Sequence, residues 1–339
     1  MSQHITIIGD GSMATVCALL LDGNGHKVTV WGAFGEHIAE LIQTRQNKKY
    51  LPGYPIPESI RYTAEDGSAF KDAELILSAV PTQYMRSVWQ RLASQVPAGV
   101  PIASVAKGIE NETMLRPTQI VADVLHDHPD RKPRPLAAIS GPSVADELAR
   151  CLPATVCAAS DDDAFARHLQ ETFTTSWFRV YTNSDLLGVE LAGATKNVIA
   201  LAAGILDGLQ AGNNAKSALL SRGLAEIARL GAAMGAKSET FFGIAGVGDL
   251  ATTCFSPTGR NRTCGELLGK GIKLEDCLKQ IHGVVEGVPT TKSVVALAKK
   301  YKVEMPITAA VHKVLFERLD PIEAISQLMS REPKPERIG

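Results

Sequence analysis

The sequence lacks a charge excess of either sign. Its 35 lysines and arginines nearly balance its 36 aspartates and glutamates, for a formal net charge of -1 at pH 7. Because nucleic-acid-binding proteins carry a basic excess, we expect no nucleic-acid partner, while a local anion site stays open. The hydrophobic fraction of 45% and the charged fraction of 21% exclude disorder, collagen and coiled coil as the main state. The 339 residues have room for about two domains of roughly 150 residues each.

Long apolar runs and closely spaced cysteine pairs are also missing. The longest apolar stretch, residues 198–206, is far short of the roughly 20 residues that a membrane-spanning helix needs. The first residues, MSQHITIIG, hold no basic segment and no cleavage site, so we expect no secretory signal. A CxxC spacing is typical of structural zinc sites and of redox-active cysteines. This spacing does not occur among the six cysteines, Cys17, Cys151, Cys157, Cys254, Cys264 and Cys277. We therefore expect a cytoplasmic protein with reduced thiols, no membrane span and no metal.

The first half of the chain alternates short apolar runs with helical patterns such as residues 12–21 and 83–92. Parallel strands read as continuous apolar runs because helices cover both faces of their sheet. The alternation therefore predicts βαβ units and an α/β domain with a doubly wound, mainly parallel sheet. Its predicted strands are residues 5–8, 28–31, 75–80, 102–105, 136–139, 154–158 and 178–181.

The second half reads as all-α. From residue 183 onward strand signals nearly vanish, and helices are predicted over residues 186–209, 215–234 and 290–301. The first of these is apolar nearly all round, which places it in a core or an interface and makes a homodimer our expectation. We predict a sheet domain over residues 1–182, a helical domain over residues 183–330 and a fraying tail over residues 331–339.

A glycine-rich turn follows the first predicted strand and opens the first predicted helix. Residues 9–14 (GDGSMA) fit the pattern G-x-G-x-x-G/A. Gly9 permits the tight turn, Gly11 lets the backbone approach a pyrophosphate, and Ala14 allows close packing of helix and strand. The helix N-terminus then offers free N–H groups to the anion. The turn thus predicts dinucleotide binding, with a plain structural turn as the alternative.

The residues that should select the cofactor are missing after the second strand. An acidic residue about 20 positions after the glycines would favour NAD, and an arginine nearby would favour NADP. Here that position is Trp31, followed by Gly-Ala-Phe-Gly, and the nearest candidates are Glu36 and Arg45. The choice between NAD and NADP stays open.

Two polar segments follow strands of the predicted sheet, where ligands of open α/β sheets bind. Lys107 comes just after the strand 102–105, and Gly141 and Ser143 follow the strand 136–139. The alternatives are a solvated lysine in a loop and a serine that caps a helix.

Two more polar segments lie in the helical half. Lys196 and Asn197 interrupt the long apolar helix, where buried polar groups need partners, although a lysine can also reach out to solvent. Asp249 sits in a glycine-rich turn and is a candidate partner for a lysine. Arg260 and Asn261 begin a predicted helix, so they suit a phosphate, with a solvated Arg-Asn-Arg run as the alternative.

Together these segments resemble the NAD(P)-dependent glycerol-3-phosphate dehydrogenases of the bacterial type, over nearly the whole chain. The motifs are KYLPG (49–53), VPTQYMR (80–86), VAKGIE (105–110), SGPS (140–143), KNVIA (196–200), GDL (248–250), GRNR (259–262), VEG (285–287) and MPI (305–307). The resemblance implies an N-terminal Rossmann domain. It also implies an all-α C-terminal substrate domain that resembles the helical domain of 6-phosphogluconate dehydrogenase.

The resemblance also implies a reaction and its residues. The reaction is reversible hydride transfer between NAD(P)H and dihydroxyacetone phosphate, which gives sn-glycerol 3-phosphate for glycerophospholipid synthesis. Lys196 would donate and accept the proton at the substrate C2 oxygen, beside Lys107 and Asp249. The implied substrate contacts are Lys107, Gly141, Ser143, Lys196, Asp249, Thr253, Gly259, Arg260 and Asn261. To Gly9, Gly11 and Ala14, the resemblance adds cofactor contacts at Ser12, Met13, Lys107, Ala145, Arg260, Val284 and Glu286.

This chain departs from the family pattern at three positions. Met13 replaces an aromatic residue, Ala33 replaces an arginine common in the family, and Gly259 replaces the serine of a Ser-Arg-Asn motif. The first two bear on cofactor choice, and the third removes a hydroxyl near the phosphate. Two alternative functions remain: a related two-domain NAD(P) reductase with another small substrate, and a dinucleotide-binding regulator without turnover. The regulator would not need Lys107, Lys196 and Asp249 together.

Overall fold

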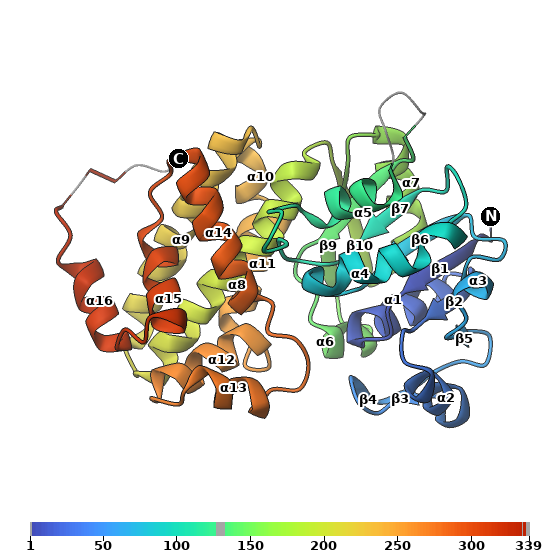
Figure 1. Cartoon of the computed structure of the whole chain (residues 1–339), viewed down its shortest axis with the longest axis horizontal. Coiled ribbons are helices and arrows are strands. Elements are labelled where there is room, and N and C mark those ends of the chain that lie inside the picture. Colours follow the sequence, from blue (N-terminus) through green and yellow to red (C-terminus); the bar gives the residue numbers. More distant parts are fainter. Residues whose placement is uncertain (1, 127–132, 334, 337–339) are drawn as a thin grey trace. The chain divides into compact units, whose positions relative to one another are not determined.

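The chain divides into two compact units in a computed structural model that describes residues 2–126, 133–333 and 335–336 (Figure 1). One unit holds Met1–Ala106 and Pro117–Leu186, and the other holds Lys107–Arg116 and Leu187–Gly339. The ten residues that begin at Lys107 therefore belong with the helical half, although they follow a strand in the chain. The boundary expected after residue 182 stays a prediction, as does the fraying tail, of which residues 334 and 337–339 lie outside the described residues.

The first unit is built on an eight-stranded sheet with the order β10-β9-β8-β7-β6-β1-β2-β5. Every neighbouring pair is parallel except β8 and β9, so the sheet is mainly parallel, as predicted. The strands are β1 (His4–Ile8), β2 (Lys27–Trp31), β5 (Arg61–Thr63), β6 (Leu75–Ser78), β7 (Ile102–Ser104), β8 (Leu136–Ser140), β9 (Ala154–Ser160) and β10 (Phe178–Asn183).

Helices cover this sheet, which explains the continuous apolar strands. In β1, Ile5, Ile7 and Ile8 are all fully buried. Helix α1 packs on β2, α5 packs on β7 and β8, and α7 packs on β9 and β10 (Figure 1). The helices of this unit are α1 (Ser12–Gly23), α2 (Gly35–Thr44), α3 (Asp66–Ala69), α4 (Thr82–Leu92), α5 (Pro117–Leu125), α6 (Ala145–Ala149) and α7 (Asp163–Phe173).

Three short strands have no counterpart among the predicted ones. They are β5 and an antiparallel pair, β3 (Gln46–Asn47) and β4 (Leu51–Pro55). Strands of two to five residues with polar, glycine and proline content carry too little pattern to be recognised. The pair β3 and β4 is a local hairpin, whereas β5 forms by pairing with the distant β2.

The order in which strands are added to the sheet reverses at β1. From β1 the chain continues to β2 on one side and later returns to β6 on the other. Open α/β sheets bind ligands at such a switch point, outside the carboxyl ends of the strands. The glycine-rich turn after β1 occupies this place.

The second unit is helical in all its described elements. They are α8 (Leu186–Gly208), α9 (Gly212–Met234), α10 (Ser238–Phe242), a π-helical turn (Ile244–Gly248), α11 (Asp249–Phe255), α12 (Arg260–Gly269), α13 (Leu274–Gln280), α14 (Gly287–Tyr301), α15 (Pro306–Phe316) and α16 (Pro321–Met329). The helices predicted over residues 186–209, 215–234 and 290–301 are confirmed as α8, α9 and α14.

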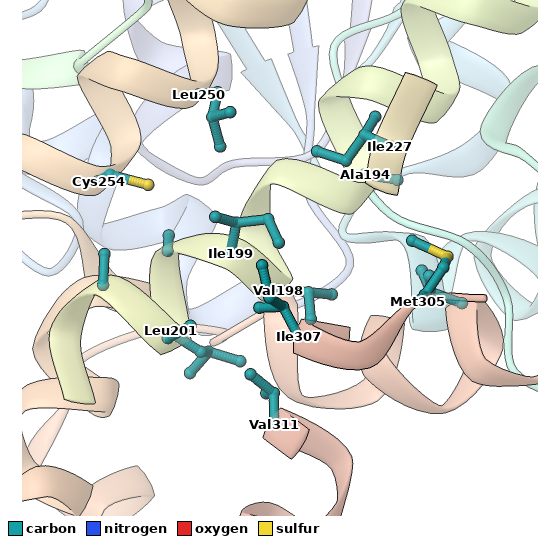
Figure 2. Packing of buried hydrophobic residues seen from close by; sticks show 14 of the residues in the cluster. Ala194, Val198, Ile199, Leu201, Ile227, Leu250, Cys254, Met305, Ile307 and Val311 are labelled. Atoms are coloured by element: carbon teal, nitrogen blue, oxygen red, sulfur yellow. The ribbon is translucent and has the colours of Figure 1, made fainter. Parts of the chain in front are cut away.

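Helix α8 runs through the core of this unit. Figure 2 shows its Val198 and Leu201 beside Ile307 and Val311 of α15. Within the described residues, α8 is the one helix long and apolar enough to cross a membrane, yet the apolar window that passes this test is entirely buried in the protein. Its hydrophobic surface is therefore used for packing, as expected of a helix that is apolar all round.

Helices α8 and α12 cross in backbone contact. A Cβ added at Gly204 of α8 would lie 1.9 Å from the Arg262 carbonyl oxygen, and one added at Gly265 of α12 would lie 2.0 Å from the Leu201 carbonyl oxygen. Neither glycine can be replaced without moving a helix, since real Cβ atoms do not approach so closely. The crossing sets the position of the first turn of α12 relative to Lys196 on α8.

A buried carboxylate joins α9 to the start of α15. Glu226 accepts hydrogen bonds from the backbone N–H groups of Ile307 and Thr308 at 2.6 and 3.2 Å, and from the Thr308 hydroxyl at 3.3 Å. Burial raises the pKa of Glu226 to about 7 despite these bonds. A carboxyl group whose pKa is raised by folding stabilises the fold most when it is protonated.

We predict that Glu226 makes the fold less stable as the pH rises from about 4.5 to about 7. Below this range the Glu226 carboxyl group is neutral in both the folded and the unfolded chain. Within it, the carboxyl group ionises in the unfolded chain but stays protonated in the folded protein, so the unfolded chain is stabilised. The loss is on the order of 3 kcal/mol at most. Urea unfolding of the wild type and of Glu226→Gln between pH 5 and 8 measures it, with the exposed Glu239→Gln as control. Parallel curves for the wild type and Glu226→Gln would contradict the prediction.

Candidate active site

One buried carboxylate bridges two lysines in the helical unit. Lys107 Nζ lies 2.7 Å from Asp249 Oδ2, and Lys196 Nζ lies 2.9 Å from Asp249 Oδ1. The exposed fractions of the three side chains are 16%, 7% and 2% for Lys107, Lys196 and Asp249. Lys196 comes from α8, Asp249 is the first residue of α11, and Lys107 comes from the segment 107–116. With all three groups ionised, the cluster holds one net positive charge.

Burial and mutual charge shift the titration of this cluster. Desolvation lowers the pKa of Lys107 to about 8, with the neighbouring Lys196 acting in the same direction and Asp249 against it. Burial opposes ionisation of Asp249, but the combined attraction of the two ammonium groups outweighs burial and holds the pKa of Asp249 below its ordinary value. Asp249 is therefore an anion that keeps two cations in a buried place.

Thr253 completes the surroundings of Lys196. The Thr253 hydroxyl donates to the backbone carbonyl of Asp249 at 2.7 Å, one turn earlier in α11, and accepts a hydrogen bond from Lys196 Nζ. An ammonium group has three N–H donors. Asp249 and Thr253 are the two recorded acceptors among the described residues, which leaves the third donor of Lys196 for a ligand oxygen.

A chain of amide hydrogen bonds connects the lysines to α12. Asn197 Nδ2 donates to the Lys107 carbonyl, Asn261 Nδ2 donates to Asn197 Oδ1, and the backbone N–H of Gly287 donates to Asn261 Oδ1, each at 2.9 Å. Asn197 was not among the predicted site residues, although its place beside Lys196 in an apolar helix was a usable signal. The amide of Asn261 is engaged inside the protein, so its backbone N–H is the better group for a phosphate.

The other polar interruption of α8 is also paired. Glu190 bonds with Arg116, at the end of the segment that begins at Lys107. The hydroxyl of Ser293 on α14 donates to the Ile109 carbonyl in the same segment. These contacts hold the segment 107–116 on the helical unit and so fix the backbone that carries Lys107.

The first turn of α12 has the features of an anion site. Arg260 and Asn261 are its first two residues, as predicted, and Gly259 is the N-cap without a side-chain hydrogen bond. The Arg260 side chain is exposed, and its guanidinium lies against Gly283, where an added Cβ would be 2.9 Å from Nη1. Gly283 directly precedes Val284, so Arg260 lies beside the loop that also carries Glu286.

The predicted cofactor residues of the first unit lie where β1 ends. Gly9 has a φ of +118°, and a Cβ there would lie 2.8 Å from the Ala79 carbonyl oxygen, so the position requires glycine. Gly11 is the N-cap of α1 and has open space where a Cβ would be. The N–H groups of Ser12 and Met13 begin the helix behind it, and Ala14 is buried. A phosphate can therefore approach the backbone at Gly11.

Gly141, Ser143 and Ala145 follow β8. Because β1, β6, β7 and β8 are successive parallel neighbours, these residues lie at the same edge of the sheet as the glycine-rich turn. Gly141 has a φ of +141°. Ser143 donates to the Gly141 carbonyl at 2.9 Å and does not cap α6, whose N-cap is Val144. The alternative role of Ser143 as a helix cap is thus wrong.

Comparison with known proteins gives the family. Residues 4–166 match the N-terminal part, and residues 185–326 the C-terminal part, of NAD-dependent glycerol-3-phosphate dehydrogenase. The chain belongs to this dehydrogenase family. It is 46% identical to glycerol-3-phosphate dehydrogenase [NAD(P)+] of Bacillus pumilus over 97% of this chain and 94% of that protein. It is 44% identical to the protein of the same name from Geobacter sp. over the full length of both chains.

A solved structure of the family supports the fold. The crystal structure of glycerol-3-phosphate dehydrogenase from Coxiella burnetii matches with a TM-score of 0.92 and 39% identity, over 97% of this chain and 99% of that chain. The predicted Rossmann sheet with a helical C-terminal domain is confirmed. Among the described residues there is no cluster of three or more His, Cys, Asp or Glu side chains placed to hold a metal ion.

Proposed function

We propose that this protein is an NAD(P)-dependent glycerol-3-phosphate dehydrogenase that interconverts dihydroxyacetone phosphate and sn-glycerol 3-phosphate, for glycerophospholipid synthesis. The observation that carries the proposal is the buried Asp249 carboxylate between Lys107 and Lys196, within 2.7 and 2.9 Å. The family of the chain and the names of its full-length relatives support the same reaction.

The residues of the first unit suit a nicotinamide dinucleotide. Gly9 leaves no room for a side chain, Gly11 is open, and the start of α1 faces the turn with its N–H groups. When bound, the dinucleotide supplies or takes up the hydride. We assign cofactor contacts to Ser12, Met13 and Ala145 of this unit. The family resemblance implies further contacts at Lys107, Arg260, Val284 and Glu286.

Lys196 acts at the carbonyl oxygen of the substrate. Reduction of a ketone places negative charge on its oxygen, and an ammonium group can stabilise that charge and then donate a proton. The third N–H donor of Lys196 is suited to this oxygen, since Asp249 and Thr253 hold the other two in place. Lys107 adds a second positive charge, and the Asp249 carboxylate orients both lysines by bonding to each of them.

The start of α12 binds the phosphate. Arg260 offers a planar, doubly donating side chain, and the free N–H groups of the first turn add backbone donors. Asn261 contributes its backbone N–H, since its side chain is bonded to Asn197 and Gly287. Binding the remote phosphate orients C2 of the substrate. Gly141 and Ser143 would line the substrate side, and Gly259 lacks the hydroxyl that a serine would add.

We predict that Arg260→Ala lowers kcat/KM for dihydroxyacetone phosphate by about a hundredfold, because a charged hydrogen-bonding pair contributes roughly 3 kcal/mol. Arg262→Ala is the matched control, since Arg262 is two residues away but bonds to Asp207 at 2.6 Å. Steady-state kinetics with both variants measures the difference. An unchanged kcat/KM in Arg260→Ala would remove Arg260 from the phosphate site.

The test of the proposed function is the oxidation of NADH and NADPH with dihydroxyacetone phosphate and with unphosphorylated dihydroxyacetone. Rapid turnover with the phosphorylated ketone alone is the expected result. No turnover in folded protein that still binds a dinucleotide would contradict the proposal and favour another substrate, or the regulator. We further propose a cytoplasmic homodimer, as expected from the sequence. The mass in solution tests the dimer.

A further inference from the structure

In Rossmann domains the residue that distinguishes NAD from NADP follows the second strand. In this chain the residues between β2 and α2 carry no charge. Trp31 ends β2, and Gly32, Ala33 and Phe34 follow before α2 begins. Phe34 is 72% exposed, as a residue that could face an adenine would be. The first acidic residue after β2, Glu36, already belongs to α2 and is exposed.

The Arg91 side chain lies beside the end of β2, where it is paired with the Asp66 carboxylate. Arg91 of α4 donates to Asp66 through Nε at 2.9 Å and Nη2 at 2.8 Å, and its guanidinium lies 5.0 Å from the Trp31 ring centre. Trp31 Nε1 also donates to Asp66, at 3.1 Å. A guanidinium that is paired with a carboxylate through two hydrogen bonds is neutralised and is poorly suited to bind a further phosphate.

A carboxylate from another turn lies at the end of β2. Asp10 stands between Gly9 and Gly11, and its Oδ2 would be 2.5 Å from a Cβ added at Gly32. The carboxylate can approach so closely because Gly32 has no side chain. The Asp10 backbone is held as well, because fully buried Asn47 donates to the Asp10 carbonyl at 2.9 Å.

The Asp10 carboxylate is incompletely paired. Its Oδ2 is buried and has no hydrogen-bond partner, although polar groups in protein interiors nearly always have one. Burial raises the pKa of the Asp10 carboxyl group above its ordinary value, and His37 and the exposed Lys49 act against that shift. Within the part of the chain that the structure describes, the Asp10 carboxylate thus lies at the end of β2 without an ion-pair partner.

We propose that Asp10 selects the cofactor, and that the protein prefers NAD(H) to NADP(H). In Rossmann domains an acidic residue at the end of the second strand bonds the adenosine ribose 2′-hydroxyl, and a carboxylate in that place repels a 2′-phosphate. Here the carboxylate reaches the same place from the glycine-rich turn. Asp10 is thus a specificity-determining residue that the usual spacing after the glycines does not reveal. This inference rests on the proposed dinucleotide-dependent function.

Fluorescence titration with NADH and with NADPH, without substrate, tests the proposal. The wild type should bind NADH at least tenfold more tightly than NADPH, since the 2′-phosphate brings about two negative charges toward Asp10. Asp10→Asn, and Asp10→Ala as a second variant, should reduce this ratio about tenfold by weakening NADH binding and strengthening NADPH binding. Glu36→Gln is the matched control, because Glu36 is the first acidic residue that follows β2 in the sequence. This variant should leave the ratio of the two affinities within twofold of the wild-type value. Thermal unfolding confirms that each variant is folded.

Three results would overturn the proposal: tighter binding of NADPH by the wild type, an unchanged ratio in both folded Asp10 variants, or an equal shift in Glu36→Gln. Lys49→Met adds a further arm, because Lys49 is an exposed cation whose charge acts on Asp10. A larger shift of the ratio in Lys49→Met than in Asp10→Asn would give the selection to Lys49. Because the titration needs no turnover, an enzyme inactive on dihydroxyacetone phosphate would contradict the proposed reaction and leave this ratio interpretable.

Discussion

Replacing Lys196 by methionine should lower kcat for dihydroxyacetone phosphate by about a thousandfold or more, with dinucleotide binding unchanged. The variant loses both the positive charge beside the substrate oxygen and the proton donor. Methionine keeps most of the volume of lysine in a buried position, so packing is largely preserved. Steady-state kinetics gives kcat, and fluorescence titration gives the dissociation constant for the dinucleotide.

The chain offers a matched control for this variant. Lys216 is a second buried lysine, 7% exposed, and it pairs with Asp207 at 2.7 and 2.8 Å on another part of the helical unit. Lys216→Met removes an equally buried ammonium group without touching Asp249. We expect it to lower stability but to retain kcat within a few fold. Near-normal turnover in Lys196→Met would exclude Lys196 from the reaction.

Asp249→Asn should damage both the fold and the reaction. The carboxylate holds two ammonium groups, and an amide in its place has one oxygen for one lysine and turns an N–H₂ group toward the other. Breaking a buried ion pair in this way costs about 3–5 kcal/mol of stability, because the remaining charges are uncompensated. We expect kcat/KM to fall at least a hundredfold, since Lys196 loses the partner that orients it.

Urea unfolding and steady-state kinetics of Asp249→Asn measure the two effects. Asp207→Asn serves as the control for stability, because Asp207 also joins two cations, Lys216 and Arg262, but is 22% exposed. Its loss of stability should be smaller, since water screens the remaining charges. If Asp249→Asn were as stable and active as the wild type, Lys107, Asp249 and Lys196 would not act as one unit.

The pKa of Lys107 offers an independent test of the interaction between Lys107 and Asp249. Burial lowers it to about 8, and Asp249 acts against that shift. Removing the Asp249 charge should therefore lower the pKa of Lys107 further, so that this lysine loses its proton at a lower pH in Asp249→Asn. The alkaline side of the pH profile of kcat/KM should move to lower pH in the variant.

Local pattern was sufficient for most strands of the large sheet and for the long helices. The strand β1 was predicted from a short apolar run, and the helix α8 from a long stretch rich in Ala, Leu and Ile. Lys196 stood out because a lysine in an apolar helix needs a partner. The strand β5 was not predicted, since it pairs with β2 about 32 positions earlier in the chain. The strands β3 and β4 pair with each other locally, but they are too short and irregular to show a strand pattern.

Distances between remote residues needed the folded chain. Lys107 and Asp249 are 142 positions apart, and no pattern in the sequence says that their charged groups lie 2.7 Å from each other. The orientation of the Asn261 side-chain amide is fixed by hydrogen bonds with Asn197 and Gly287, which lie 64 and 26 positions away. The resemblance to a family suggested these residues as neighbours, without their bonds.

Composition, periodicity and motif order in the sequence were enough to establish the class of fold, the glycine-rich turn and the residue types that carry the chemistry. These features are local, because strand and helix periods and turn preferences arise within a few residues. The packing of the chain decided which groups meet: Asp249 between two lysines, Asn261 turned toward Asn197, and Asp10 over Gly32. Such contacts depend on how buried surfaces close against one another, and a glycine such as Gly32 acquires its meaning only from the atom that packs against it.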